Sequence, residues 1–146
     1  MTDVAWLAGF FDGEGSIELA IARNTKGGQI RVQLRCEIAN THQESIDHVR
    51  GLLDVYKIDS YKGMRDRSKY NSKTAYRLII AGYHNTTAFI RLLLPYLVTK
   101  KEHAELALSY VSTHKYMGPI SSEDLAIANR LRLINSRGLR KQEVYA

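Results

Sequence analysis

The chain has 146 residues, of which 45% are hydrophobic and 25% charged, and this length suffices for one globular domain with a hydrophobic core. No apolar run approaches the roughly 20 residues of a membrane span, no signal peptide is expected, and the single cysteine, Cys36, excludes an internal disulfide and a cysteine-based zinc site, so we expect an intracellular protein with no membrane attachment. The formal net charge of +6 and the pI of about 9.5 favour polyanionic partners, nucleic acid first among them.

The periodicity of apolar residues predicts a helix over residues 3–13, followed by a strand pair. From Ser16 the period changes to two, which predicts a strand, a turn over residues 24–29 and a second strand over residues 30–39. Thr41 begins a capping-box pattern for a helix to about residue 57. A second strand pair is predicted over residues 61–67 and 74–81, joined by a polar turn.

Asn85 is expected to cap a helix through Leu94, which Pro95 interrupts. A capping box from Thr99 predicts a helix to about residue 116, and Ser121 or its neighbour caps a last helix before a frayed tail over residues 136–146. The order of elements predicts an α+β fold with an αββαββα core, a four-stranded antiparallel sheet, helices packed on one face, and extra C-terminal helices. Without a domain-separating linker, residues 1–146 are predicted to form a single domain.

One face of the predicted sheet is expected to meet solvent, and basic and amide side chains dominate it. The residues expected there are Arg31, Gln33, Arg35, Arg65, Arg67, Lys73 and Arg77, with Glu18, Glu37 and Asp66 as the acids. A twisted ribbon fits the DNA major groove, where Arg binds guanine and Gln binds adenine through paired hydrogen bonds. A solvated sheet face also tolerates Arg and Gln, but the excess of cations favours nucleic-acid binding.

Residues 7–17, LAGFFDGEGSI, place two carboxylates where an apolar helix ends. The unpaired carbonyls of a helix end carry partial negative charge, so Asp12 and Glu14 are disfavoured there unless a partner offsets the cost. A divalent cation is the obvious partner, yet a single Glu is a poor site because hard cations take several oxygen ligands.

Small residues form a stripe on the same helix. Ala5, Gly9 and Gly13 recur every four residues, with Ala8 and Asp12 beside them. Gly9 costs about 1 kcal/mol relative to alanine, which calls for a packing reason. That reason is either a tight neighbour within the chain or close approach of a second copy of the helix. In the second case two Glu14 carboxylates would meet near a twofold axis, and together with backbone carbonyls, phosphates and water they would suit Mg²⁺.

The segment LAGFFDGEG resembles the LAGLIDADG motif of homing endonucleases, and the element order is similar to their αββαββα core over nearly the whole chain. The motif occurs once, as in the homodimeric subfamily, whose motif helices form the dimer interface. The resemblance implies hydrolysis of both strands of a long, roughly palindromic double-stranded DNA site, leaving short 3′ overhangs. It also implies Mg²⁺, with Mn²⁺ or Ca²⁺ as other occupants, no small-molecule cofactor, and a gene in an organelle, a prokaryote or a phage.

The resemblance assigns roles to individual residues. Glu14 falls on the metal-binding acid, Gly13 on the residue whose backbone carbonyl binds metal, Asn40 on a polar residue that orders water, and Lys100 on the basic residue near the active site. The implied DNA-binding residues are Glu18, Asn24, Arg31, Gln33, Arg35, Glu37, Arg65, Arg67, Lys73 and Arg77. The implied dimer interface consists of Ala5, Ala8, Gly9, Asp12 and Gly13, with Asp12 also in a mainly structural role.

Two other interpretations stay open. A LAGLIDADG-type intron maturase or transcription regulator binds DNA or RNA with the same fold but without cleavage. Such proteins often lack the final acid or the basic partner, whereas this chain keeps Glu14 and Lys100. The other is an unrelated small basic protein in which DGEG is only a turn, which would be a monomer and would tolerate Glu14→Gln.

Overall fold

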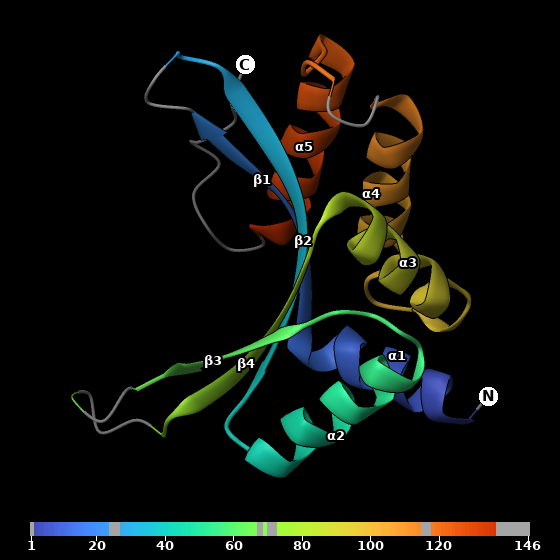
Figure 1. Ribbon diagram of the computed structural model, residues 1–146. Coiled ribbons are helices and arrows are strands. Elements are labelled where there is room, and N and C mark those ends of the chain that lie inside the picture. Colours follow the sequence, from blue (N-terminus) through green and yellow to red (C-terminus); the bar gives the residue numbers. More distant parts are fainter. Residues whose placement is uncertain (1, 24–26, 67–68, 70–72, 115–117, 137–146) are drawn as a thin grey trace.

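The computed structural model describes residues 2–23, 27–66, 69, 73–114 and 118–136 (Figure 1). Its elements in chain order are α1 (Thr2–Glu14), β1 (Gly15–Arg23), β2 (Ile30–Asn40), α2 (Gln43–Val55), β3 (Tyr61–Arg65), β4 (Ala75–Ala81), α3 (Tyr83–Leu93), the 3-10 helix η2 (Leu94–Tyr96), α4 (Lys101–Thr113) and α5 (Ser122–Asn135). The predicted αββαββα order with additional C-terminal helices is confirmed. The tail predicted to fray lies, from residue 137 on, outside the described residues.

The four strands form one antiparallel sheet in the order β1-β2-β4-β3. Its register places Glu18 opposite Arg35 in β2, and Arg77 opposite Ala39. Figure 1 shows the labelled helices on the same side of the sheet, which leaves the other side open. Because side chains alternate along a strand, this arrangement sorts every second residue into the core and exposes the rest.

The core lies between the sheet and its helices. The inward residues of β2, Leu34, Cys36 and Ile38, are buried, and they meet Leu7 and Phe11 of α1 in one hydrophobic cluster. Full burial of such side chains contributes about 1.5–3 kcal/mol each. None of the described helices is both long enough and apolar enough to cross a membrane.

Two of the predicted helix starts are wrong, the first by one residue and the second by three. The N-cap of α2 is His42 and not Thr41, and the His42 Nδ1 accepts a hydrogen bond from the Ser45 backbone N–H. The N-cap of α3 is Gly82, whose φ of 97° suits glycine, so Asn85 lies inside the helix. The Asn85 side chain does not cap its own helix: its Oδ1 accepts a hydrogen bond from the Asp59 backbone N–H, and its Nδ2 donates one to the Asp59 carbonyl oxygen, in the segment between α2 and β3.

The two C-terminal helices begin in different ways. The N-cap of α4 is Lys100, which makes no side-chain capping bond, so the capping box predicted from Thr99 is absent. The N-cap of α5 is Ser121, as predicted, and it forms a capping box with Asp124. The start of α5 is therefore closed by its own residues, whereas the start of α4 needs a partner from elsewhere.

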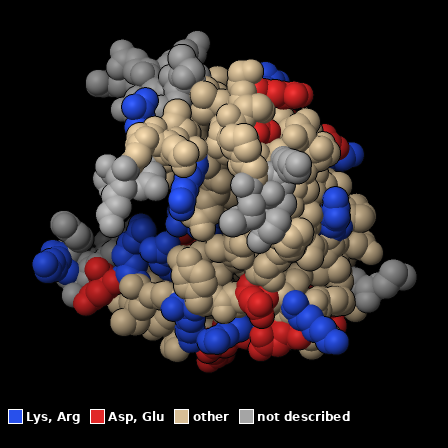
Figure 2. All heavy atoms as spheres, turned by 45° about the horizontal axis from the view of Figure 1, so that its top comes forward, with Lys and Arg blue, Asp and Glu red and all other residues tan. Residues whose placement is uncertain are grey.

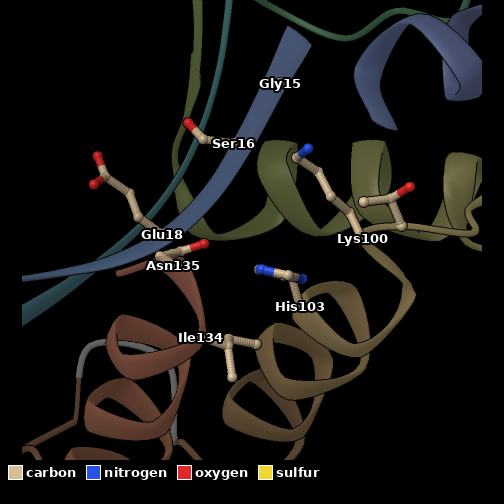
Figure 3. Close-up of a pocket in the computed structure, with 8 residues that line it drawn as sticks. Gly15, Ser16, Glu18, Lys100, His103, Ile134 and Asn135 are labelled. Carbon is tan, nitrogen blue, oxygen red and sulfur yellow. The ribbon is translucent and has the colours of Figure 1, made fainter. Parts of the chain in front are cut away.

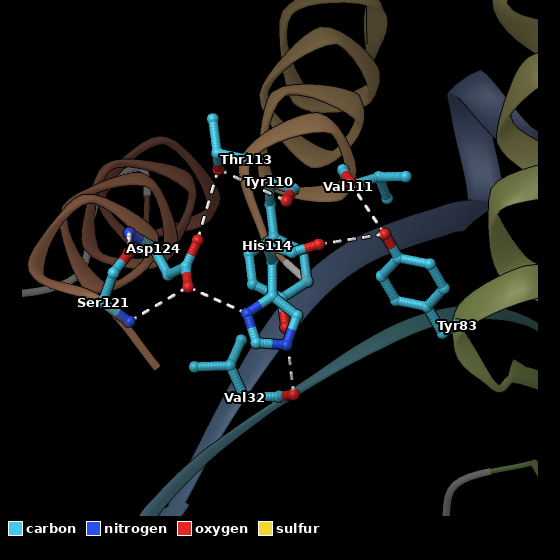
Figure 4. A network of polar contacts seen from close by, with 8 residues as sticks. All are labelled: Val32, Tyr83, Tyr110, Val111, Thr113, His114, Ser121 and Asp124. Atoms are coloured by element: carbon cyan, nitrogen blue, oxygen red, sulfur yellow. Dashed lines mark hydrogen bonds and ion pairs between the residues drawn. The ribbon is translucent and has the colours of Figure 1, made fainter. Parts of the chain in front are cut away.

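A buried polar network joins the end of α4 to the start of α5 (Figure 4). The Asp124 carboxylate accepts hydrogen bonds from the Ser121 backbone N–H and the Thr113 hydroxyl, and its Oδ2 lies 2.8 Å from His114 Nδ1. The His114 ring stacks on Tyr110 with centroids 4.9 Å apart. Every oxygen of this buried carboxylate therefore has a partner, which is the condition for a stabilising buried charge.

One edge strand of the sheet is bonded to the C-terminal helix. β1 is an edge strand, and Asn135 at the end of α5 donates from Nδ2 to the Ile17 carbonyl oxygen over 2.8 Å. The bond satisfies a backbone group on that edge and fastens α5 to the strand that follows α1.

Candidate active site and nucleic-acid interface

The helix α1 has two apolar faces. Val4, Leu7, Ala8 and Phe11 are buried against the core, whereas Gly9 on the opposite side is exposed. Ala8 shares the Val4 and Phe11 face because of its spacing along the helix. Its assignment to a dimer interface is therefore wrong: Ala8 is fully buried in its own chain and has no surface to offer a partner.

The exposed stripe of α1 has no neighbour that explains its small residues. A Cβ added at Gly9 or at Gly13 would meet no described atom within 4 Å. Of the two explanations for the stripe, a tight contact within the described part of the chain is thus excluded. Gly15 differs, because a Cβ there would collide with the Phe11 ring. Gly15 is thus required by packing within the chain, and Gly9 is not.

Aromatic rings extend the exposed apolar face of α1. Trp6 is 42% exposed and stacks on Phe10 with ring centroids 5.2 Å apart, and His48 of α2 meets the Trp6 ring at 4.9 Å. Residues 4–11 carry no charged side chain. A helix that is apolar all round is typical of one covered on both sides.

At the end of α1, Asp12 is fully engaged with the start of α4. Its carboxylate accepts hydrogen bonds from the backbone N–H groups of Val98, at 2.8 Å, and Lys100, at 2.9 Å. The Lys100 Nζ in turn donates to the Asp12 carbonyl oxygen over 2.6 Å. Asp12 therefore supplies the cap that α4 lacks and fixes Lys100 beside the end of α1.

Glu14, two residues later, is exposed, and its carboxylate forms no hydrogen bond or ion pair with any described residue. It lies close enough to Lys100 to act on it electrostatically. Burial lowers the pKa of the Lys100 ammonium, and the charges of Asp12 and Glu14 oppose that shift without cancelling it. Lys100 therefore gives up a proton more readily than a solvated lysine does.

The oxygen donors at this helix end suit a hard divalent cation but do not complete a site. The carbonyls of the last helical turn have no intrahelical partner, so that of Gly13 is available next to the Glu14 carboxylate. Within the residues that the structure describes, no three His, Cys, Asp or Glu side chains gather to hold a metal. Among the described residues, Glu14 and the Gly13 carbonyl therefore make only part of a metal site.

A cleft of about 380 Å³ opens beside Lys100 (Figure 3). It lies between the start of β1, the start of α4 and the end of α5, and it is lined by Gly15, Ser16, Glu18, Thr99, Lys100, His103, Ile134 and Asn135. Sequence reasoning gave His103 no role. The signal available was its spacing, because residues i and i+3 share a helix face and His103 follows Lys100 by three.

Asn40 lies near the same end of the sheet. Gly15 pairs with Ile38, so Asn40 follows two residues beyond the last paired position of β1 and β2. Its Oδ1 accepts a hydrogen bond from the His42 backbone N–H over 2.8 Å, which shapes the turn into α2. The structure thus gives Asn40 a turn-forming role close to the end of α1.

Except for Lys73, the described residues predicted for DNA binding lie on the open face of the sheet, and Asn24 and Arg67 lie outside the described residues. Arg31, Gln33 and Arg65 are exposed on this face, and Lys73 is exposed in the segment just before β4. Figure 2 shows mostly lysine and arginine among the charged groups on the left of the view, where this face lies, and a mixture of both signs along the lower edge. This distribution of charged side chains is consistent with the predicted excess of cations on the open face of the sheet.

Two arginines of this face are paired within the sheet. Arg35 contacts Glu18 directly opposite in β1, and the Arg77 Nη2 donates to Glu37 Oε2 over 2.8 Å. These two arginines are therefore partly neutralised by their partners and are less available to phosphates than unpaired arginines. Sequence alternation placed these side chains on one face but did not indicate the pairing, which depends on strand register.

Solved structures of homing endonucleases share the fold. An archaeal intron-encoded homing endonuclease complexed with DNA is 15% identical, with a TM-score of 0.74 over 98% of this chain and 90% of that chain. The homing endonuclease I-CvuI, in complex with its target in the presence of 2 mM Ca, is 21% identical, with a TM-score of 0.66 over 91% of this chain and 82% of that chain. The meganuclease I-SmaMI bound to uncleaveable DNA is 17% identical, with a TM-score of 0.69 over 97% of this chain and 46% of that chain.

A comparison with curated proteins found no match. The family model described as LAGLIDADG endonuclease matches residues 7–111. That range runs from the middle of α1 through the sheet into α4, and it includes Glu14 and Lys100. Covering well over half of the sequence, the match shows that the chain belongs to the LAGLIDADG endonuclease family.

Proposed function

We propose that this protein is a site-specific homing endonuclease that acts as a homodimer on double-stranded DNA with a divalent metal ion. The observation that carries the proposal is the end of α1: Glu14 is exposed and unengaged, while Asp12 holds Lys100 beside it. A carboxylate left open next to a partly buried ammonium is an arrangement suited to phosphodiester hydrolysis.

Pairing of α1 with its copy supports the homodimer. Gly9 and Gly13 leave open space on a face that has no charge between Asp3 and Asp12, so two such helices can approach closely. The match to less than half of the I-SmaMI chain is consistent with this, because that chain has room for a second unit of this size. The dimer would bring two Glu14 carboxylates together and supply the oxygens that one chain lacks.

Glu14 and the Gly13 carbonyl would hold the metal, for which Mg²⁺ is the proposed ion and Mn²⁺ or Ca²⁺ are alternatives. A bound ion of this kind supplies an activated water and stabilises the leaving oxygen in phosphodiester hydrolysis. Lys100 would donate a hydrogen bond to the scissile phosphate and stabilise the charge that develops on it. Two active sites related by a twofold axis would account for a roughly palindromic site, and we propose the short 3′ overhangs from the resemblance of the motif alone.

Cleavage by Glu14→Gln tests the proposal. A plasmid library with randomised inserts is incubated with the protein and Mg²⁺, and linearised members are sequenced. We expect the wild type to cut a defined subset, and Glu14→Gln to bind that subset but cut it at least about a hundredfold more slowly. Glu44→Gln, an exposed acid on α2, is the control and should cut normally.

Cutting by Glu14→Gln at the wild-type rate would refute the assignment of Glu14. A wild type that binds tightly and never cuts would indicate a LAGLIDADG-type binding protein, such as a maturase or regulator, instead of a nuclease.

The dimer is tested by Gly9→Leu. Because Gly9 faces open space in the single chain, a leucine there should leave the monomer folded but separate the two helices. Gly51→Leu is a matched control, since Gly51 is also helical and a Cβ there meets nothing within 4 Å. Sedimentation should show a dimer for the wild type and Gly51→Leu and a folded monomer for Gly9→Leu. An unchanged dimer in Gly9→Leu would exclude this interface.

A further inference from the structure

We infer that Glu37 is a positioning residue for DNA recognition: it holds the Arg77 guanidinium so that its free edge selects guanine, and it makes no base contact of its own. The inference rests on the proposed function, in which the open sheet face binds DNA. It adds separate roles for two neighbouring residues of that face: Arg77 contacts the base, and Glu37 positions Arg77.

The geometry of the pair fixes the arginine along the sheet surface. Arg77 stands opposite Ala39, whereas Glu37 stands opposite Ile79, so the pair crosses the β2–β4 ladder diagonally. Diagonal neighbours across a ladder are within reach of long side chains. The hydrogen bond from Arg77 Nη2 to Glu37 Oε2 is 2.8 Å, and the side chains are only 23% and 21% exposed.

Gly63 in β3 lies beside the stem of Arg77. Gly63 is the register partner of Arg77, and a Cβ added there would lie at van der Waals distance, 3.8 Å from the Arg77 Cδ. The stem of Arg77 therefore passes close to the β3 backbone, while Glu37 holds its guanidinium. A long side chain that is already held by an ion pair loses less further entropy when a base pair binds it.

The remaining donors of Arg77 match guanine. A guanidinium has five N–H groups, of which one is used by Glu37. The Arg77 Nε is buried and has no hydrogen-bond partner among the described residues, so it does not face the groove. The terminal nitrogens are left to make the paired hydrogen bonds to guanine O6 and N7 that constitute the commonest specific contact in the major groove.

The carboxylate also changes what kind of contact Arg77 can make. Because Glu37 neutralises much of its charge, Arg77 is a weaker partner for phosphates than the exposed Arg31, Arg65 and Lys73. Base edges, which are read by hydrogen-bond geometry, remain available to it. Glu18 and Arg35 repeat the arrangement between β1 and β2, but with side chains 37% and 32% exposed, so we expect a weaker effect there.

The alternative is that Glu37 itself reads a base, since glutamate can accept a hydrogen bond from cytosine N4. The two possibilities differ in where specificity is lost. If Glu37 positions Arg77, removing either residue relaxes the same base pair. If Glu37 reads a base directly, the two variants relax different base pairs.

The experiment selects bound fragments from a randomised double-stranded DNA library, with a metal chelator in place of Mg²⁺ so that selection is on binding and not on cleavage. The wild type, Arg77→Ala, Glu37→Ala and the double variant are compared. We expect one position of each half-site to show a guanine preference that Arg77→Ala reduces by about tenfold or more. Glu37→Ala should reduce the preference at that same position, and the double variant should add no further loss.

Two further variants separate positioning from folding. Glu37→Gln keeps an acceptor oxygen and should retain most of the preference. Glu37→Val removes the acceptor with a side chain that favours strands, so it serves if alanine destabilises the sheet. Glu44→Ala on α2 is the control away from the DNA, and thermal unfolding verifies each protein.

A Glu37→Ala profile identical to that of the wild type would overturn the inference, and so would a loss confined to a position that Arg77→Ala leaves intact. A wild type that selects no sequence at all would instead overturn the proposed function. The two failures are therefore distinguishable in one data set.

Discussion

The two ends of α4 are each fastened by an aspartate, but they differ in how completely they are closed. At its end, Asp124 is 1% exposed and bonds to the Ser121 backbone, Thr113 and His114. At its start, Asp12 bonds to two backbone N–H groups, and Glu14 beside it remains open to solvent. At the closed end both carboxylate oxygens are buried and bonded within the chain, and this arrangement serves stability. The open end keeps a carboxylate and a carbonyl for ligands.

The pKa values of the two ends show the same difference. Burial raises the pKa of Asp124, but the hydrogen bonds from Ser121 and His114 outweigh it, and the pKa is lowered overall. Burial lowers the pKa of Lys100, and here the neighbouring carboxylates do not outweigh it. Hydrogen bonds therefore stabilise the Asp124 carboxylate at the closed end. At the open end the Lys100 ammonium is partly desolvated and less well compensated, as is common for charged groups in active sites.

The largest effect is expected at the closed end. Asp124→Ala leaves His114, Ser121 and Thr113 without their shared acceptor, which should lower the free energy of unfolding by about 3 kcal/mol. Urea unfolding at pH 7 measures this, with Glu123→Ala, an exposed neighbour on α5, as the control. DNA cleavage by the folded variant should be unchanged. A decrease of less than about 1 kcal/mol in the free energy of unfolding would show that the Asp124 end of α4 does not contribute the proposed stability.

At the open end the effect should fall on activity. Lys100→Ala removes the ammonium proposed to contact the scissile phosphate, and cleavage should fall about a hundredfold. Because burial disfavours the charge of Lys100, the free energy of unfolding of the Lys100→Ala variant should differ from that of the wild type by less than about 1 kcal/mol. Single-turnover cleavage and urea unfolding give the two values, and Lys101→Ala, an exposed lysine in the next position, is the control. A drop in stability without a drop in cleavage would reverse the proposed roles.

The smallest expected effect is a pH dependence of the stability that Asp124 contributes. The folded-state pKa of Asp124 lies below its ordinary value of 3.8, so the unfolded chain binds the proton more tightly. The stabilisation by Asp124 is present above that value and is lost as the pH falls through the lowered pKa. The difference in unfolding free energy between the wild type and Asp124→Asn should thus shrink below about pH 4. Urea titrations at pH 7, 4 and 3 would show this, and a difference independent of pH would contradict it.

Much of the fold follows from local patterns in the sequence. The alternation of Leu34, Cys36 and Ile38 with charged residues separates the two faces of β2, and the structure agrees. The cap of α5 was predicted at Ser121 or its neighbour, and the structure has Ser121 bonded to Asp124, only three residues away. Elements whose stabilising contacts are close in sequence are thus visible to pattern reasoning.

The features that escaped prediction depend on distant contacts. The start of α4 is capped by Asp12, which lies 88 residues earlier than Lys100, so the local signal at Thr99 was misleading. The pairing of Arg77 with Glu37 depends on strand register, which alternation alone does not determine. Ala8 was grouped with the small-residue stripe because of its size, but its position around the helix axis places it in the core.

The bond between Asn135 and the Ile17 carbonyl bears on solubility at high concentration. An uncovered edge strand is a template on which other chains can add, and β1 forms one border of the sheet. Because the last turn of α5 occupies a backbone acceptor of β1, it disfavours edge-to-edge pairing with another molecule. Shortening the chain before Asn135 would therefore do more than remove a helical turn, since it would expose the backbone of an edge strand immediately after the segment proposed to bind metal.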